Sequence, residues 1–541
     1  MILSCQIGVE ECTDRFLPTH FRRKCYFNRP LSGCQRMLIQ PIGAMPPAAE
    51  KYQLNTRPEN RFLEKAAKTY DRKACMNDTI AAIATAPGSA GLGVIRISGP
   101  GALSVAQALF SPARPNAPLI PRQMRFGSVT YGGRSAGDAL AVYFPAPHSY
   151  TGEDVAELQM HGNPAVLSAV LAAACTLGAR PAGRGEFTKR AFLNGRIDLS
   201  QAEAVAELIA APSPEGAALA AAKLDGALGK RIRSLREKIE YVRKRLCLAI
   251  DFPEEEGECL PTEEFQTLLD ELIAECSALT ASYRRALPWT DGAVVALAGK
   301  VNAGKSSLMN ALLGRNRAIV TPHAGTTRDY LEERTSIEGV PVRLTDTAGI
   351  RPEGCTLPDP IEAEGIRRSL EIMSRADLIV LVADMSGLNA EAAMKEAAVL
   401  AEAAAGAQDS ERKVPVILAL NKTDLPGPHG NIPRAEDVFA AVCPISAKTG
   451  SGIDRLCSEI RAALVGREWM PDEAAPNKRQ CGLIEECLSE LSALRAEAGQ
   501  IPPDIAAVRI EQASASLADV TGLNTAEDTF NAIFEEFCIG K

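Results

Sequence analysis

The chain has 541 residues, of which 46% are apolar and 23% are charged, and it contains no apolar run near the roughly 18 residues that a membrane span requires. This length suits about three or four globular domains, and we expect a cytoplasmic protein. The 15 cysteines include no CxxC pair, which disfavours a cysteine-based metal site, and the lack of a secretory segment favours reduced thiols.

Charge is distributed unevenly. Residues 1–75 carry 13 Lys and Arg against 7 Asp and Glu, whereas the remaining residues carry 46 against 60. The acidic body disfavours indiscriminate nucleic-acid binding, because such binding depends on many basic side chains against phosphates. A local basic patch remains compatible with this charge.

Residues 1–75 show no sustained helical or strand period, so we expect no stable domain there. Three interpretations stay open: a misassigned start codon with initiation at Met76, which we favour, a disordered basic tail, and an organelle transit peptide. Glu10, Glu11 and Asp14 disfavour the transit peptide, since such peptides are poor in acidic residues.

Residues 76–194 are predicted to form a small α/β domain. The pattern predicts a strand, a glycine-rich turn and a second strand over 77–98, further strands near 126–131 and 139–144, and a helix over 164–177.

Two polar stretches of this domain, 150–158 and 180–190, place carboxylate and guanidinium groups in or beside loops. Loops are where binding residues tend to lie. The alternative is solvated loop charge with weak surface ion pairs, and composition does not decide between the two.

Residues 195–290 and 467–541 are predicted to form one helical domain. Apolar residues three or four positions apart form a stripe on a long helix, with members Ile232, Leu235, Ile239, Val242, Leu246 and Ile250. The second segment keeps this period at Ile484, Leu488, Leu491, Ile510, Ala513, Leu517 and Val520. Because each stripe needs a partner, a single bundle built from both segments is the economical arrangement, with residues 291–466 inserted as a separate domain.

The inserted domain begins with the pattern G-x-x-x-x-G-K-S at 299–306, after the apolar run 293–298 and before a helix start at 308–313. Such a loop turns its backbone N–H groups around phosphate oxygens. Lys305 would reach the β- and γ-phosphates, and Ser306 would offer a hydroxyl to Mg²⁺. A chance match is the alternative, which the strand–loop–helix context disfavours.

Four further motifs follow at predicted strand ends. Asp346-Thr347-Ala348-Gly349 places a carboxylate near Mg²⁺ and a glycine near the γ-phosphate, and Gly325-Thr326-Thr327 supplies a further hydroxyl. In Asn421-Lys422-Thr423-Asp424, the last carboxylate can accept two hydrogen bonds from guanine that adenine cannot donate. Ser446-Ala447-Lys448 can close over the base. Each motif alone is weak, but in this order they predict GTP binding.

Ile350 stands where Ras-like enzymes carry the glutamine that orients the attacking water, and it cannot form that hydrogen bond. Glu362 and Glu364 are the nearest candidate carboxylates, although either could be an exposed glutamate at a helix start. No arginine finger can be assigned. Asn302 could instead hold a monovalent cation where the charge of that finger would lie.

These motifs, together with the blocks 152–154, 185–187 and 194–204 and the terminus 537–541, resemble the MnmE/TrmE family of tRNA wobble-uridine modification GTPases. The resemblance covers residues 76–541. It implies a multi-domain fold, α/β plus all-α, in which an N-terminal α/β folate-binding and dimerisation domain precedes a helical bundle interrupted by a Ras-like P-loop GTPase domain.

The resemblance also implies the activity. A homodimer of such chains joins the FAD-carrying protein MnmG in a heterotetramer that acts on tRNA. The complex uses GTP, Mg²⁺, K⁺ and 5-formyl- or 5,10-methylene-tetrahydrofolate to place an aminomethyl or carboxymethylaminomethyl group on C5 of the wobble uridine. Potassium stimulates hydrolysis, which accompanies pairing of the GTPase domains. Glycine and ammonium both remain open as nitrogen donors. The alternative is a regulatory or ribosome-assembly GTPase switch without folate chemistry, which needs neither the terminus nor the folate-like blocks.

Site roles follow from the same resemblance. Glu362 would orient water, although the loop before it is longer than in the family. Cys538 matches a cysteine implicated in activity, with a reduced thiol buried near an aromatic helix end as the alternative. Ser306 and Thr327 would bind Mg²⁺, and K⁺ would be held by Asn302, Thr321, Thr326 and the carbonyl of His323. Folate would contact Arg96, Glu157, Arg196 and Lys541. The nucleotide would contact Asn302, Ala303, Gly304, Lys305, Ser306, Ser307, Thr321, Pro322, His323, Ala324, Gly325, Thr326, Thr327, Asp346, Thr347, Ala348, Gly349, Asn421, Lys422, Asp424, Ser446, Ala447 and Lys448.

Overall fold

The computed structural model describes residues 78–115, 117–251, 261–315, 332–346, 372–386, 414–425, 439–466, 474–535 and 537–540. Several expectations lie outside these residues. They concern the extension 1–75 and the site residues Thr321–Thr327, Thr347–Ile350, Glu362, Glu364 and Lys541.

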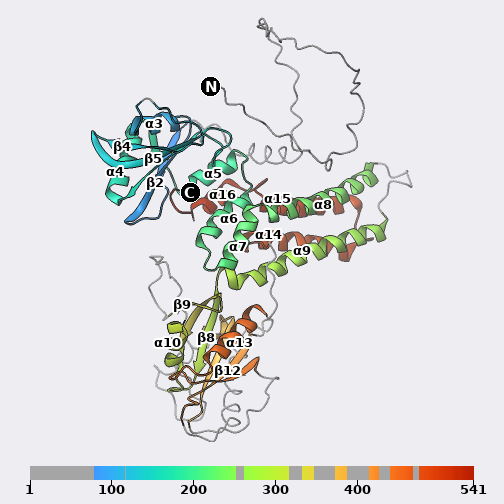
Figure 1. The fold of residues 1–541 in the computed structure, drawn as a ribbon. Coiled ribbons are helices and arrows are strands. Elements are labelled where there is room, and N and C mark those ends of the chain that lie inside the picture. The colour runs from blue at the N-terminus through green and yellow to red at the C-terminus, as the bar shows by residue number, and fades with distance from the viewer. Residues whose placement is uncertain are drawn as a thin grey trace, which may run out of the picture. The chain divides into compact units, whose positions relative to one another are not determined.

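The N-terminal part forms a seven-stranded sheet in the order β3-β4-β5-β6-β2-β1-β7 (Figure 1). Its strands are β1 (Thr79–Ile83), β2 (Ala90–Ser98), β3 (Phe110–Pro112), β4 (Arg125–Tyr131), β5 (Arg134–Phe144), β6 (Val155–Gly162) and β7 (Ala179–Pro181). Neighbours are antiparallel except β1 and β7, which run parallel. The predicted strands and helix of this region are confirmed, with ends that shift by a few residues.

Helices α3 (Ala102–Leu109) and α4 (Pro164–Thr176) contribute to the core of this sheet. The helix α4 begins where Asn163 accepts hydrogen bonds from the N–H groups of Ala165 and Val166. On β2, Ile95 and Ile97 are fully buried in this core. Because successive side chains of a strand face opposite sides, Arg96 lies on the other face of the sheet.

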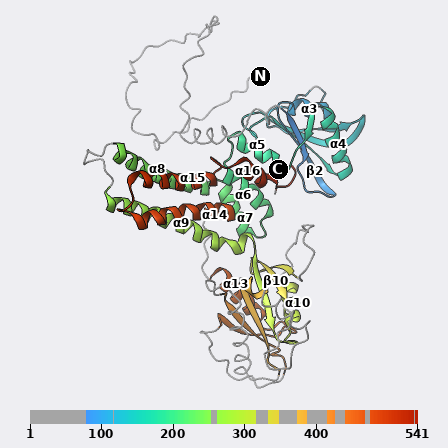
Figure 2. The same ribbon diagram turned by 180° about the vertical axis from the view of Figure 1, so that it is seen from behind.

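The helical part combines both predicted segments. Its helices are α6 (Leu199–Ala210), α7 (Pro214–Leu224), α8 (Ala227–Asp251), α9 (Thr262–Thr290), α14 (Lys478–Glu497), α15 (Pro503–Val520) and α16 (Glu527–Glu535). The helix α5 (Glu186–Leu193) precedes them and belongs to the N-terminal domain. In both views α8 lies beside α15, and α9 lies beside α14 (Figures 1 and 2). The prediction of one bundle built from both segments is therefore confirmed. No helix in the described part of the chain is long and apolar enough to cross a membrane.

The apolar stripes meet inside this bundle. From α8 the core includes Ile232, Leu235, Ile239, Val242 and Leu246, and it includes residues of α9, α14 and α15. The prediction is wrong for the sixth member of the stripe. Ile250 is 40% exposed and lies one residue before the end of α8.

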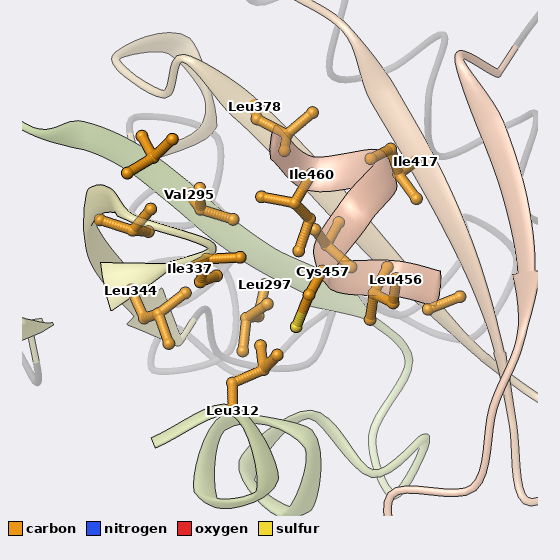
Figure 3. Packing of buried hydrophobic residues seen from close by; sticks show 14 of the residues in the cluster. Val295, Leu297, Leu312, Ile337, Leu344, Leu378, Ile417, Leu456, Cys457 and Ile460 are labelled. Carbon is orange, nitrogen blue, oxygen red and sulfur yellow. The ribbon is translucent and has the colours of Figure 1, made fainter. Parts of the chain in front are cut away.

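The inserted part forms a six-stranded sheet in the order β13-β12-β11-β8-β10-β9. Its elements are β8 (Ala293–Gly299), α10 (Lys305–Arg315), β9 (Glu332–Ile337), β10 (Val340–Asp346), β11 (Leu378–Asp384), β12 (Val416–Asn421), β13 (Ala441–Pro444) and α13 (Ile453–Val465). All neighbours are parallel except β9 and β10. Leu297 of β8, Leu312 of α10 and Ile460 of α13 pack together in one core (Figure 3).

The parallel strands decide where the polar motifs gather. In the strands β8, β10, β11 and β12 the last residues are Gly299, Asp346, Asp384 and Asn421. Because the carboxyl ends of parallel strands share one edge of a sheet, these residues meet where such folds bind ligands.

Candidate functional site

The phosphate loop joins β8 to α10 and depends on two glycines with positive φ. Gly299 has φ +144°, and a Cβ there would lie 2.3 Å from the carbonyl oxygen of Val382. Gly304 has φ +98°, and a Cβ there would lie 2.2 Å from Nδ2 of Asn421. Neither position leaves room for a side chain, and Asn302 also adopts a left-handed φ of 64°.

Two polar side chains of this loop have hydrogen-bond partners within the domain. The Nζ of Lys305 donates to the carbonyls of Gly299 and Lys300 at 3.1 and 3.0 Å. Burial lowers the pKa of Lys305, and the charge of Asp346 partly opposes this. Ser306 Oγ donates to Oδ2 of Asp346 at 2.8 Å.

The residues Ser306 and Asp346 also fit a divalent cation. Oδ1 of Asp346 is buried and has no hydrogen-bond partner among the described residues. A hydroxyl beside a carboxylate with a free oxygen is a donor set that Mg²⁺ accepts together with phosphate oxygens.

The base-recognition motifs are tied to the phosphate loop through Asn421, which is 3% exposed. Its Nδ2 donates to the carbonyl of Ala303 at 2.9 Å, and its Oδ1 accepts from the N–H of Ala447 at 2.9 Å. Ser446 Oγ donates to Asp424 at 2.7 Å, and this hydrogen bond lowers the pKa of the Asp424 carboxyl. The lowered pKa favours the ionised carboxylate, which is the form required by the predicted role of Asp424 as an acceptor for guanine.

Asp384, near the base-recognition motifs, was not predicted as a site residue from the sequence. Asp384, the last residue of β11, pairs with Nζ of Lys422 at 2.5 Å and accepts from the N–H of Ser386 at 2.8 Å. Burial alone would raise the pKa of Asp384, but these two partners outweigh it and lower the pKa. The signal available in the sequence was an aspartate at the end of the apolar run 378–383.

In the N-terminal domain, two of the predicted folate residues form an ion pair. Nε of Arg96 lies 2.9 Å from Oε1 of Glu157, directly opposite on β6, and each side chain is 17% exposed. The Arg96 guanidinium lies 5.3 Å from the ring centroid of Tyr150 and 5.8 Å from that of Phe187. These distances suit cation–π contacts, and the sequence reasoning had not assigned either aromatic residue.

Arg196, a third predicted folate residue, is exposed and lies against the loop that follows Tyr150. A Cβ on Gly152 would stand 3.2 Å from Cγ of Arg196. The fourth, Lys541, lies outside the described residues.

The segment that carries Cys538 lies against the N-terminal domain. The carbonyl of Cys538 accepts from the N–H of Gly185 at 3.5 Å, and Ile539 forms a β-bridge with Arg184. A Cβ on Gly540 would lie 2.4 Å from the carbonyl oxygen of Ile83. The Cys538 thiol is in an exposed residue, so the alternative of a buried thiol is wrong.

Two family models match parts of this chain, and individual known proteins match most of its length. The TrmE N-terminus family matches residues 79–196, and the MnmE helical domain family matches residues 199–538. The tRNA modification GTPase MnmE of Nitratidesulfovibrio vulgaris (strain DP4) is 47% identical over 473 residues, which are 86% of this chain and 99% of that protein. The chain belongs to the MnmE family of tRNA modification GTPases. The Thermus thermophilus member is 40% identical and matches 86% of this chain over its own full length.

Membership of this family gives the general activity of the chain. The chain is a GTP-hydrolysing enzyme of tRNA modification. Among solved structures, the G domain of the T. maritima FeoB iron transporter is 26% identical and covers 32% of this chain and 98% of that one. Its TM-score of 0.22 is too low to support a structural argument.

Proposed function

We propose that this chain is the GTP-hydrolysing and folate-binding half of a complex that adds an aminomethyl or carboxymethylaminomethyl group to C5 of the tRNA wobble uridine. The observation that carries the proposal is the Arg96–Glu157 pair beside the Tyr150 and Phe187 rings. A cation and a carboxylate beside aromatic rings suit a planar, amide-bearing ring, because the rings stack and the charges form directed hydrogen bonds. Tetrahydrofolate derivatives have this chemistry.

The other predicted folate contacts complete the proposal. Arg196 and Lys541 would offer positive charge to the anionic tail of the folate. The one-carbon unit would come from 5-formyl- or 5,10-methylene-tetrahydrofolate. Cys538, exposed on a segment against the same domain, is the proposed further reactive residue.

On the nucleotide side, Ser306 and Thr327 would hold Mg²⁺. K⁺ would be held by Asn302, with oxygens from Thr321, His323 and Thr326. This cation would supply the charge that an arginine finger supplies elsewhere, and pairing of two GTPase domains would accompany hydrolysis. Glu362 would orient the attacking water. The left-handed backbone of Asn302, beside the phosphate loop glycines, supports its part in this arrangement.

The proposed assembly is a homodimer that joins the flavoprotein MnmG and acts on tRNA in the cytoplasm. FAD would come from the partner, and either glycine or ammonium would supply nitrogen. The competing function is a GTPase switch that binds RNA or protein partners without folate.

Titration calorimetry with 5-formyl-tetrahydrofolate separates these two functions. We expect saturable binding to the parent chain, and loss of that binding in Arg96→Ala with GTP turnover retained. A parent chain that binds no folate would favour the switch.

GTP turnover in KCl and in NaCl tests the nucleotide roles. We expect faster turnover in KCl, and we expect Asn302→Ala to remove the difference. Glu362→Ala should bind GTP normally and turn it over slowly. Equal parental rates in the two salts would contradict the role of Asn302.

A further inference from the structure

A cluster of charged side chains surrounds the buried Arg190 in the N-terminal domain. Arg190 of α5 is 2% exposed, and its guanidinium reaches carboxylates from three different segments. Nη2 donates to Oδ1 of Asp78 at 2.6 Å and to Oε1 of Glu186 at 3.1 Å, and Nη1 donates to both oxygens of Glu153 at 3.2 and 3.1 Å. The interpretation of this stretch as solvated loop charge is therefore wrong for Arg190.

The cluster has a second, more exposed cation. Arg180, whose side chain is 46% exposed, pairs with Asp78 and Glu186. Burial alone would lower the pKa of Arg190, but the facing carboxylates outweigh it and raise the pKa. Burial would raise the pKa of Asp78 and Glu186, but the two arginines outweigh it and lower both values. Two cations thus hold three carboxylates.

Two of the three carboxylates, Glu186 and Glu153, lie on segments that carry an aromatic residue of the candidate folate site. Glu186 is followed directly by Phe187, whose ring lies beside Arg96. Glu153 follows the loop of Tyr150, and its Oε2 accepts from Ser98 on β2, two residues from Arg96. Glu153 thus connects the Arg190 guanidinium of α5 to the 150–153 loop and, through Ser98, to β2.

The two aromatic residues are also linked to each other through α5. The hydroxyl of Tyr150 is hydrogen-bonded to Oγ1 of Thr188 at 2.8 Å, and Thr188 is fully buried. Movement of α5 relative to the loop would therefore change the positions of Phe187 and Tyr150 together.

We propose that Arg190 is a positioning residue for the candidate folate site: it fixes Tyr150 and Phe187 beside the Arg96 guanidinium without touching the ligand. This inference rests on the proposed folate-binding function. Only a guanidinium can serve here, because three carboxylates around one planar fork need several donors in fixed directions, which a lysine ammonium lacks.

The test compares Arg190→Lys, Arg180→Gln and the parent in the full chain, with Lys238→Gln as a control. Lys238 pairs with Glu275 in the helical bundle, so its substitution removes a paired cation far from this cluster in the fold. Three quantities are measured: the Kd of 5-formyl-tetrahydrofolate, the circular dichroism that the bound pterin ring acquires at saturation, and GTP turnover.

We expect Arg190→Lys to raise the folate Kd about tenfold or more and to alter the circular dichroism at saturation, because displaced rings misplace the ligand. GTP turnover should remain near the parental rate and show that the chain is folded. Arg180→Gln should raise Kd by about twofold, because its exposed ion pairs contribute little, and Lys238→Gln should match the parent.

Two outcomes would overturn the positioning role. One is a parental Kd and dichroism in Arg190→Lys. The other is a raised Kd with unchanged dichroism at saturation, which indicates a structural role only. A parent chain that binds no folate would instead contradict the proposed function itself, and the two failures are therefore distinguishable.

Discussion

Asn421 joins the phosphate loop to the 446–448 loop, which are proposed to hold opposite ends of the nucleotide, and Asn421→Ala should uncouple them. The substitution removes the hydrogen bonds to the Ala303 carbonyl and the Ala447 N–H, both 2.9 Å long. A backbone group left unsatisfied in a buried place costs about 1–3 kcal/mol. Two such groups predict a loss of about 2–4 kcal/mol in the unfolding free energy of the GTPase domain, allowing some access of water.

The same loss should weaken nucleotide binding. Without the hydrogen bond from Asn421, GTP binding must itself order the phosphate loop, which costs binding free energy. We therefore expect the Kd for GTP to rise at least about tenfold, which corresponds to about 1.4 kcal/mol. Urea unfolding with and without GDP measures the first quantity, and titration with a fluorescent GTP analogue measures the second.

A matched control is Asn163→Ala, which removes the cap of α4 in another domain. Its side chain also accepts two backbone hydrogen bonds, and loss of such a cap costs about 1 kcal/mol. It should leave the Kd for GTP unchanged. If Asn421→Ala destabilises no more than Asn163→Ala and binds GTP like the parent, the two loops are not coupled in this way.

Three further outcomes follow. Gly304→Ala should lose GTP binding more than about tenfold by titration, because its Cβ would lie 2.2 Å from Asn421 Nδ2 at a φ of +98°; parental binding would refute the clash. Leu491 is fully buried, so Leu491→Ala should lower the unfolding free energy of the bundle by about 2–5 kcal/mol. Ile250 is 40% exposed, so Ile250→Ala should change the same free energy by less than about 1 kcal/mol. Equal losses in the two variants would contradict the observed burial. The folded pKa of Glu186 is below its ordinary 4.5, so its stabilisation is fully present above that pH and is lost as pH falls further. Acid unfolding should be less steep in Glu186→Gln, and an unchanged profile would count against the cluster.

Local pattern predicted much of the fold. The stripe from Ile232 to Leu246 identified a buried helix face because helical period is a local property, and the phosphate loop was recognisable from its spacing and flanking elements. The prediction that Ile250 is buried was wrong, since the period of a sequence does not show where a neighbouring helix stops covering the stripe.

Contacts between distant segments could not be predicted. Arg190 lies 37 residues from Glu153 and 112 from Asp78, so its charge was indistinguishable from loop charge until the segments were placed together. The bridge from Asn421 to Ala303 spans 118 residues, and the sequence assigned both residues to nucleotide binding without relating them. The position of the Tyr150 and Phe187 rings beside Arg96 in the candidate folate site could likewise not be predicted from the sequence.

The most direct test of the proposed function is the mass of the wobble nucleoside in unmodified tRNA after incubation with this chain, the flavoprotein partner, GTP, a tetrahydrofolate one-carbon donor and glycine or ammonium. We predict a C5-substituted uridine that requires both GTP and the folate, and no product when the chain carries Arg96→Ala. The modified nucleoside formed at the parental rate without folate, or with Arg96→Ala, would contradict the proposed function.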